Sequence, residues 1–133
     1  MLKEFKFHHI GIATKNIQIT ANIYINAGYN QSQIYNDRIQ NVSVSFLTKT
    51  NNPMIELVEP INLDSPINSI LSNNGTIPYH LCYEVNDIFE SIINLKALKY
   101  IAISKPVTAV AFENRKICFL YNKDIGLIEL LEK

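Results

Sequence analysis

A short apolar segment with a carboxylate at its centre occurs twice in this chain, and it limits the folds the chain can adopt. Ile55-Glu56-Leu57-Val58-Glu59 lies near the middle, and Ile128-Glu129-Leu130-Leu131-Glu132 lies at the C-terminus, 73 positions later. A carboxylate among apolar side chains is unfavourable unless it is paired or binds a metal ion. The repeated segment therefore predicts two copies of one structural module, each with a glutamate that needs a partner.

Other landmarks recur in the same order, which predicts an internal duplication. At an offset of 71 the matches are His9 with His80, Ile10 with Leu81, Asn16 with Asp87, Ile17 with Ile88, and Tyr29 with Tyr100. At an offset of 73 they are Val44 with Ile117, Phe46 with Phe119, Leu47 with Leu120, and Glu56 with Glu129. A two-residue change in a loop explains the shift between the offsets. Each half is predicted to read β-α-β-β-β.

In the first half, alternating apolar residues predict a strand over 6–14. Asn16 is predicted to cap a helix that runs to about Ala27, with Gly28 ending it. Further strands are predicted around 32–35, over 41–48 and over 54–59. A connector helix is predicted between Asp64 and Gly75, with Pro66 near its first turn.

In the second half, a strand is predicted over 79–85, followed by a helix capped by Asn86 or Asp87 that runs to about Lys99. An extended stretch over 100–104 and strands over 115–121 and 127–131 complete the half. The chain is thus predicted to be one domain, residues 1–133. Its first module covers about 1–62, the connector helix about 64–75 and the second module about 77–133.

The duplication suggests how the repeated histidines and glutamates are used. Two copies of a module tend to pair about a pseudo-twofold axis, which would bring His9 opposite His80 and Glu56 opposite Glu129. Two imidazoles and two carboxylates form a suitable ligand set for a six-coordinate divalent cation such as Zn, Ni, Co, Mn or Fe(II). His8 is the alternative ligand beside His9, but only His9 matches the register of His80.

Composition excludes several classes of function. The formal net charge is +0, so no basic field is available to bind nucleic acid or an anionic membrane. No apolar stretch approaches the roughly 18 residues that a membrane span needs. The two cysteines, Cys82 and Cys118, lack metal-site or redox-motif spacing. They are expected to be free thiols of a cytoplasmic protein.

The chain resembles the vicinal oxygen chelate superfamily, also called the glyoxalase/bleomycin-resistance/dioxygenase superfamily, over essentially its whole length. The resemblance is closest to the methylmalonyl-CoA epimerase-like branch. The residues that carry it are His8-His9-Ile10-Gly11-Ile12-Ala13, Gln40 to Leu47, Ile55 to Pro60, Tyr79 to Ile88, and Gly126 to Leu130. It implies an α+β fold in which two tandem βαβββ modules form a partly closed, curved-sheet barrel around one metal cleft.

The resemblance also implies the ligands His9, Glu56, His80 and Glu129, one divalent ion (Zn, Ni, Co or Mn) and a homodimer. The implied activity is a metal-dependent isomerase or lyase that removes a proton next to a carbonyl in a thioester or thiohemiacetal substrate. A lactoylglutathione lyase is an alternative, although the chain lacks tryptophan and the Trp-containing stretch usual in those enzymes. A non-catalytic antibiotic-binding resistance protein generally lacks the four ligands. An extradiol dioxygenase would need the position that Glu56 occupies.

Five side chains are candidates for further roles near the expected site. Glu129 is the first candidate for the general base, by resemblance to glyoxalases. Glu84 is a weaker candidate, suggested by its position four residues after His80 on the same strand face. Cys82 lies on that face too and is expected to line the site without reacting. Arg115 and Lys105 could bind an anionic group of the substrate.

Overall fold

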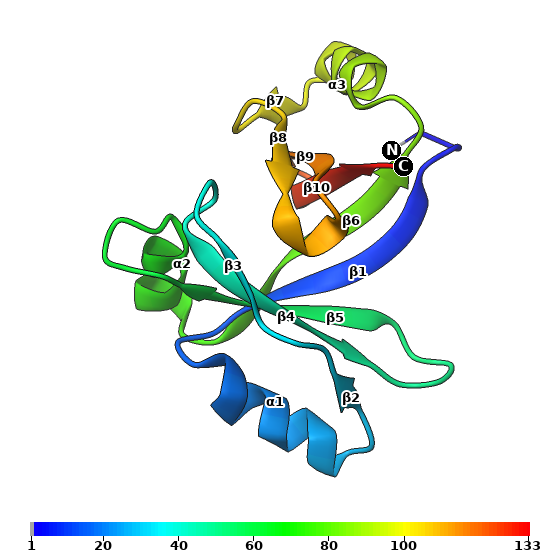
Figure 1. The fold of residues 1–133 in the computed structure, drawn as a ribbon. Coiled ribbons are helices and arrows are strands. Elements are labelled where there is room, and N and C mark those ends of the chain that lie inside the picture. Colours follow the sequence, from blue (N-terminus) through cyan, green and yellow to red (C-terminus); the bar gives the residue numbers. More distant parts are fainter. Residues whose placement is uncertain (1) are drawn as a thin grey trace. The chain divides into compact units, whose positions relative to one another are not determined.

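The computed structural model describes residues 2–133, which contain three α-helices, one short 3-10 helix and ten β-strands (Figure 1). The chain forms two compact units. The first unit comprises His9–Tyr79, and the second unit joins the N-terminal residues up to His8 to the segment His80–Lys133. Among the described residues, no helix is long and apolar enough to cross a membrane.

The sheet of the first unit is built around β4 (Val42–Thr48). Three strands pair with β4 in antiparallel fashion, namely β2 (Asn30–Gln31), β3 (Tyr35–Asp37) and β5 (Met54–Pro60). On its other side β5 pairs in parallel with β1 (Lys6–Ala13), which enters the unit at His9. Helix α2 (Ile67–Asn74) follows β5 and contacts it.

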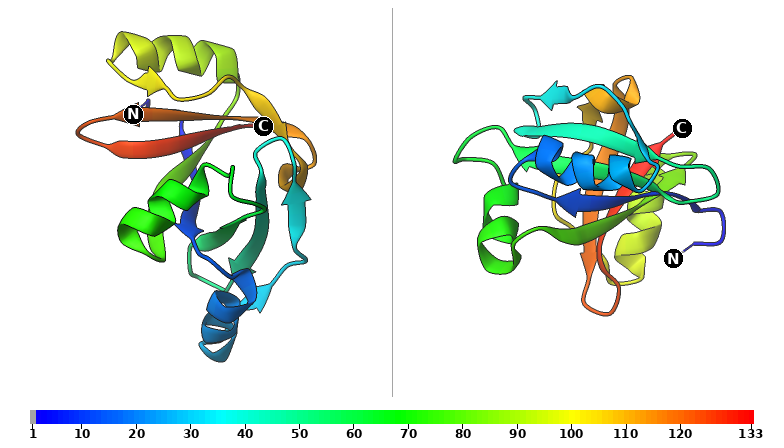
Figure 2. Two further views of the ribbon diagram at one scale, coloured as in Figure 1. Left: turned by 90° about the vertical axis from the view of Figure 1, so that its left-hand side faces the viewer. Right: turned by 90° about the horizontal axis from the view of Figure 1, so that it is seen from below.

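Helix α1 (Ile17–Asn26) lies across one face of this sheet (Figure 2). Asn16 caps it as predicted, because its side-chain oxygen accepts a hydrogen bond from the backbone N–H of Ile19. The buried side of the helix packs with strand residues into a core of Ile12, Ile17, Ala21, Leu47, Ile55 and Leu57. Among the apolar residues of the helix, Ile17 and Ala21 are buried, whereas Ile25 is exposed.

The second unit repeats this arrangement. Its strand β10 (Gly126–Glu132) pairs in parallel with β6 (Ile77–Val85) and in antiparallel fashion with β9 (Arg115–Asn122). Two short strands, β7 (Ile101–Ala102) and β8 (Val107–Ala109), both pair with β9. Helix α3 (Ile88–Ala97), capped by Asp87, runs beside the β9–β10 hairpin (Figure 2) and buries Ile88, Ile92 and Leu95. Leu98, which follows the last residue of the helix, is exposed.

Strand pairing shows the duplication residue by residue. Phe46 pairs with Glu56 in the first unit, and Phe119 pairs with Glu129 in the second. The numbering offset between equivalent residues of the two repeats was predicted to change once, by two residues. In the structure it changes twice, by one residue each time. The offset is 71 from β2 to β7, where Asn30 pairs with Thr48 and Ile101 with Tyr121. It is 72 from β3 to β8, since Tyr35 pairs with Val44 and Val107 with Ile117.

In each module, two short strands pair with the same longer strand. When these two are counted as one interrupted strand, the predicted fold class, a mixed α+β chain of two tandem βαβββ modules, is confirmed. The strand predicted around 32–35 differs in detail. Ser32 interrupts it, because the Ser32 hydroxyl accepts the backbone N–H of Phe46 at 2.8 Å. Strand β8 and the 3-10 helix Val110–Phe112 had no counterpart in the sequence analysis.

Candidate functional site

The first unit places His9 and Glu56 together. They come from the parallel neighbours β1 and β5, where Glu56 is in register with Gly11. Because Gly11 has no side chain and shares a strand face with His9, the imidazole of His9 can occupy the space beside Glu56. His9 Nε2 lies 3.4 Å from Glu56 Oε1, and both residues are buried, at 0% and 4% exposure.

The second unit contains the equivalent pair. Glu129 on β10 is in register with Cys82 on β6, two positions after His80. His80 Nε2 lies 3.4 Å from Glu129 Oε1, and the exposures are 4% and 2%. The small residue Cys82 thus takes the place that Gly11 has in the first unit. From the sequence, these four residues were predicted as one set, with His9 opposite His80 and Glu56 opposite Glu129. The contact of each histidine with the glutamate of its own unit was not predicted.

An aromatic ring lies against each histidine. Phe46, the antiparallel partner of Glu56, has its ring centroid 6.3 Å from that of His9 at an interplanar angle of 67°. Phe119, the partner of Glu129, lies 5.2 Å from His80 at 84°. These phenylalanines belonged to the predicted repeat but had no predicted site role. Antiparallel pairing with the glutamate strand is the signal that could have assigned one to them.

The distance within each pair is informative about its chemistry. A charge-assisted hydrogen bond between nitrogen and oxygen is typically about 2.7–2.9 Å, shorter than the observed 3.4 Å. Two ligand atoms that each lie about 2.0–2.2 Å from one ion are separated by about 3.0–3.5 Å. Imidazole nitrogen and carboxylate oxygen are also donors that suit Zn, Ni, Co, Mn and Fe(II). Both pairs therefore have the donors and the spacing of metal ligands.

His8, the alternative ligand, belongs to the second unit and contacts a different group. Its ring packs edge-on against Phe112, with centroids 5.7 Å apart at an interplanar angle of 79°. The preference for His9 over His8 thus agrees with the position of His9 beside Glu56.

Glu84 and Arg115, two separate candidates in the sequence analysis, form an ion pair in the second unit. Arg115 Nη2 donates to Glu84 Oε2 at 2.5 Å, and Arg115 Nε donates to the Glu132 carbonyl at 2.7 Å. This hydrogen bond from Arg115 holds the pKa of the Glu84 carboxyl below its usual value of 4.5, against the opposing effect of burial. Glu84 is therefore a weaker base than an ordinary glutamate.

The remaining candidates differ in accessibility. Neither Cys82 nor Cys118 forms a disulfide bond, and both are buried. Burial raises the pKa of the Cys118 thiol, which donates to the Ser104 carbonyl at 3.2 Å. Lys105 is exposed. The reactive-thiol chemistry of an exposed, low-pKa cysteine is thus absent at Cys118.

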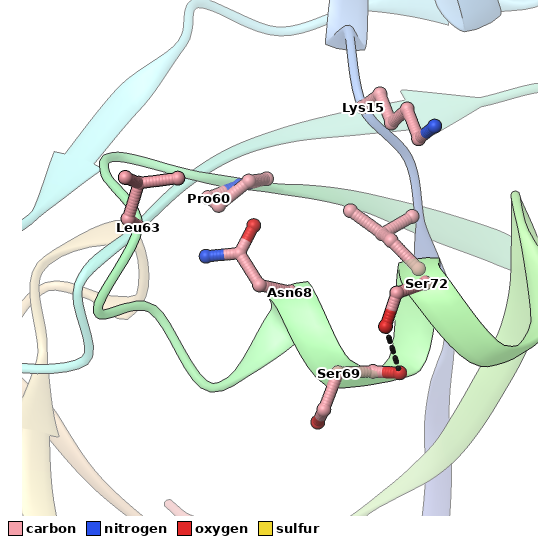
Figure 3. A pocket seen from close by; sticks show the side chains of 7 residues that line it. Lys15, Pro60, Leu63, Asn68, Ser69 and Ser72 are labelled. Carbon is pink, nitrogen blue, oxygen red and sulfur yellow. Dashed lines mark hydrogen bonds between the residues drawn. The ribbon is translucent and has the colours of Figure 1, made fainter.

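A separate hollow of about 450 Å³ lies on the first unit between the end of β5 and α2 (Figure 3). Its lining combines the Lys15 ammonium with polar and apolar side chains, namely Asn68, Ser69, Ser72, Pro60, Leu63 and Leu71. None of the residues predicted for the functional site lines it.

The chain matches the model of the glyoxalase/bleomycin resistance protein/dioxygenase superfamily over residues 8–119. It belongs to this superfamily. The match includes the strand residues His9 and Glu56 of the first unit and most of the second unit. The resemblance inferred from the sequence is therefore confirmed.

Named relatives specify the branch. The chain is 33% identical to the mitochondrial methylmalonyl-CoA epimerase of Dictyostelium discoideum, over 96% of this chain and 78% of that protein. It is 30% identical to the ethylmalonyl-CoA/methylmalonyl-CoA epimerase of Cereibacter sphaeroides, over 94% of this chain and 96% of that one. The crystal structure of methylmalonyl-CoA epimerase from Mycobacterium tuberculosis shares the fold, with a TM-score of 0.84, 23% identity and coverage of 96% and 87%. The chain is thus an enzyme of the epimerase-like isomerase type.

Proposed function

We propose that this protein is a divalent-metal-dependent epimerase that acts on the acyl group of a 2-substituted malonyl-CoA thioester. The observation that carries the proposal is the repeated, buried His–Glu pair, with 3.4 Å between donor atoms in both units. The names of the relatives at 33% and 30% identity support the thioester class of substrate. They favour it over the thiohemiacetal of a lactoylglutathione lyase.

We further propose that His9, Glu56, His80 and Glu129 together hold one divalent ion per chain. The donor set fits, because two neutral imidazoles and two carboxylates balance the charge of such an ion and suit Zn, Ni, Co or Mn. Burial of all four residues also favours binding, since unpaired charges there would be costly. When bound, the ion would supply a Lewis acid that stabilises negative charge on the carbonyl oxygen of the substrate.

Epimerisation requires the proton at C2 of the acyl group to leave and return. In this proposal the Glu129 carboxylate accepts that proton, so the C2–H bond breaks and an O–H bond forms on Glu129. The electron pair of the broken bond moves into the thioester carbonyl and gives an enolate. Return of a proton to the opposite face, from the same carboxylate or a second acid, then forms the other epimer.

The role of general base is assigned to Glu129 rather than to Glu84. Glu129 lies in a nearly dry environment, at 2% exposure, beside Phe119. Glu84 is held ionised by Arg115, and a carboxylate with a lowered pKa binds a proton less readily. Its ion pair with Arg115 is better suited to orienting the guanidinium than to transferring a proton.

The proposal is tested by exchange of the C2 proton of methylmalonyl-CoA in D2O, followed by NMR with the metal-loaded protein. Wild type should incorporate deuterium and convert one epimer into the other. Glu129→Gln keeps the size of the side chain and removes the base, so exchange should fall by about 100-fold or more. Lys123→Gln, at the exposed β9–β10 turn, is the control and should exchange like wild type. Exchange by Glu129→Gln at the wild-type rate would exclude Glu129 as the base.

A homodimer, implied by the resemblance, and a cytoplasmic location, expected from the two cysteines, stay predictions. The Dictyostelium discoideum relative is a mitochondrial protein. Sedimentation equilibrium of the purified chain would measure the mass of the assembly directly.

A further inference from the structure

We propose that Arg115 is an anion-binding residue for the substrate and that Glu84 positions its guanidinium. The anion is a phosphate or carboxylate group of the thioester, so this inference rests on the proposed function and assigns a second contact point to the same substrate.

Arg115 and Glu84 lie on the sheet face that carries His80 and Glu129. On β6, Glu84 is four residues after His80, and on β9, Arg115 is four residues before Phe119, the partner of Glu129. Side chains an even number of residues apart point to the same face of a strand. Four residues correspond to about 13 Å along a strand. The ion pair thus lies on the same face as the His–Glu pair, at a distance that a long substrate can span.

The duplication provides an internal comparison for this position. At the offsets measured for these strands, Glu84 corresponds to Ala13 and Arg115 corresponds to Val42. The offset at Arg115 is supported independently, because the residue before it, Asn114, has φ 62° and Asn41 has φ 60°. Ala13 and Val42 are buried at 0% and 5% exposure. The fold therefore accepts apolar residues at these two positions.

A partly buried ion pair is weak evidence for a role in stability, since apolar replacements are often as stable. The first repeat contains such apolar residues, and the second repeat contains the charged pair instead. This difference indicates a role that only the second repeat has. Binding of a ligand is a role that one repeat can have alone. A purely structural role at the end of the sheet would be needed in both repeats.

Arg115 is accessible and has hydrogen-bonding capacity left. Its side chain is 30% exposed, and that of Glu84 is 18% exposed. The guanidinium has five N–H donors, and the hydrogen bonds to Glu84 and to the Glu132 carbonyl use two of them. The planar group suits bidentate binding of phosphate or carboxylate oxygens.

Two parts of a malonyl-CoA thioester carry such oxygens. The acyl carboxylate is bonded to the reacting carbon, whereas the phosphates of the CoA carrier are far from it. The separation of about 13 Å along the strands favours a carrier phosphate as the partner of Arg115. The two sources are distinguished by a substrate that has the carboxylate and lacks the phosphates.

The experiment measures binding of CoA by isothermal titration calorimetry with the metal-loaded protein at low ionic strength. Arg115→Gln should raise the Kd about tenfold or more, because a charge-assisted contact is lost. Arg115→Lys keeps the positive charge but loses the planar, bidentate donors of the guanidinium, so it should raise the Kd by less than Arg115→Gln does. Lys123→Gln removes one exposed positive charge from the same unit and should stay within twofold of wild type. The unfolding midpoint of each variant is measured to confirm that it folds.

The second arm compares turnover of methylmalonyl-CoA with that of methylmalonyl-N-acetylcysteamine thioester, which has no phosphate. Arg115→Gln should raise KM for the CoA thioester and leave kcat/KM for the truncated one within twofold. An equal loss for both thioesters would place the acyl carboxylate on Arg115 instead. The proposal is wrong if Arg115→Gln leaves the CoA Kd and both KM values unchanged.

The two proposals fail in different ways. If wild type binds CoA through Arg115 but exchanges no C2 proton, the proposed reaction is wrong and the anion site stands. If exchange is normal and Arg115→Gln changes neither Kd nor KM, the epimerase stands and the ion pair is structural.

Discussion

At the scale of single residues, each unit buries a histidine directly beside a carboxylate. His9 and Glu56, and equally His80 and Glu129, approach to 3.4 Å while nearly all of their surface is removed from water. Apolar neighbours on the same strands would make either charge costly alone. This requirement for a partner is what made the glutamates recognisable in the sequence.

The ion pair Glu84–Arg115 gives a pH-dependent prediction at this scale. Because Arg115 lowers the pKa of Glu84 below 4.5, the pair stabilises the folded state above that value. The stabilisation is lost as the pH falls through the lowered pKa of the folded state. We expect Glu84→Gln to lower the free energy of unfolding by about 1 kcal/mol or less at pH 7, since the pair is partly exposed. Urea unfolding at pH 7 and in steps below pH 4.5 measures the difference, which should shrink toward acid pH. A difference that grows toward acid pH would contradict the assignment.

Single residues also show what sequence reasoning could and could not reach. The ligand candidates could be predicted because the repeat aligns His9 with His80 and Glu56 with Glu129. The pairing of Glu84 with Arg115 could not, because 31 positions separate them and their contact depends on the order of β6, β10 and β9. Alternation places both on one face but does not say which strands are neighbours.

At the scale of elements, the two helices that follow the first strand of each repeat end in the same way. Gly28 after α1 has φ 96°, and its counterpart after α3, Lys99, has φ 68°. Their N–H groups donate to the carbonyls of Ile25 and Lys96, both at 3.0 Å. The left-handed conformation is therefore required by the helix end itself, although only one of the two positions carries glycine.

This pair of helix ends predicts opposite effects of opposite substitutions. Lys99→Gly should raise the free energy of unfolding by about 0.5–1 kcal/mol, because glycine adopts positive φ without a Cβ penalty. Gly28→Ala should lower it by about 1 kcal/mol, since the added Cβ meets only the flexible end of Lys49 at 3.4 Å and the cost comes from φ. Urea unfolding of both variants tests this. Destabilisation by Lys99→Gly would show that the Lys99 side chain contributes more than the backbone strain costs.

Most element boundaries followed from local signals, and the exceptions have specific physical causes. Asn16 and Asp87 start helices because their side chains accept the N–H groups of Ile19 and Glu90. The strand predicted around 32–35 is divided because Ser32 replaces a backbone partner of Phe46 with its hydroxyl. Strand β8 depends on pairing with β9, because its three residues are too few for a period-two pattern, although Val107 and Thr108 are β-branched.

At the scale of the whole molecule, the duplication explains both what is repeated and what is not. The two repeats agree in strand pairing, helix caps and the His–Glu pairs, even though two single-residue steps separate their numbering. They differ where the second repeat has Glu84 and Arg115 and the first has Ala13 and Val42. In this account the shared residues hold the metal ion, and the residues of one repeat alone select the substrate.

The most direct test of this account is the metal content of the purified chain, measured by mass spectrometry of the metal together with the unfolding midpoint. The account predicts one divalent ion per chain. A metal at a hundred times its Kd should add about 2.7 kcal/mol, or about 10 °C in the midpoint for a chain of this size. His9→Ala and His80→Ala should each abolish both the ion and the added stability, because one ion needs both pairs. Two ions per chain, or an ion that survives in either variant, would contradict a single site shared by the two repeats.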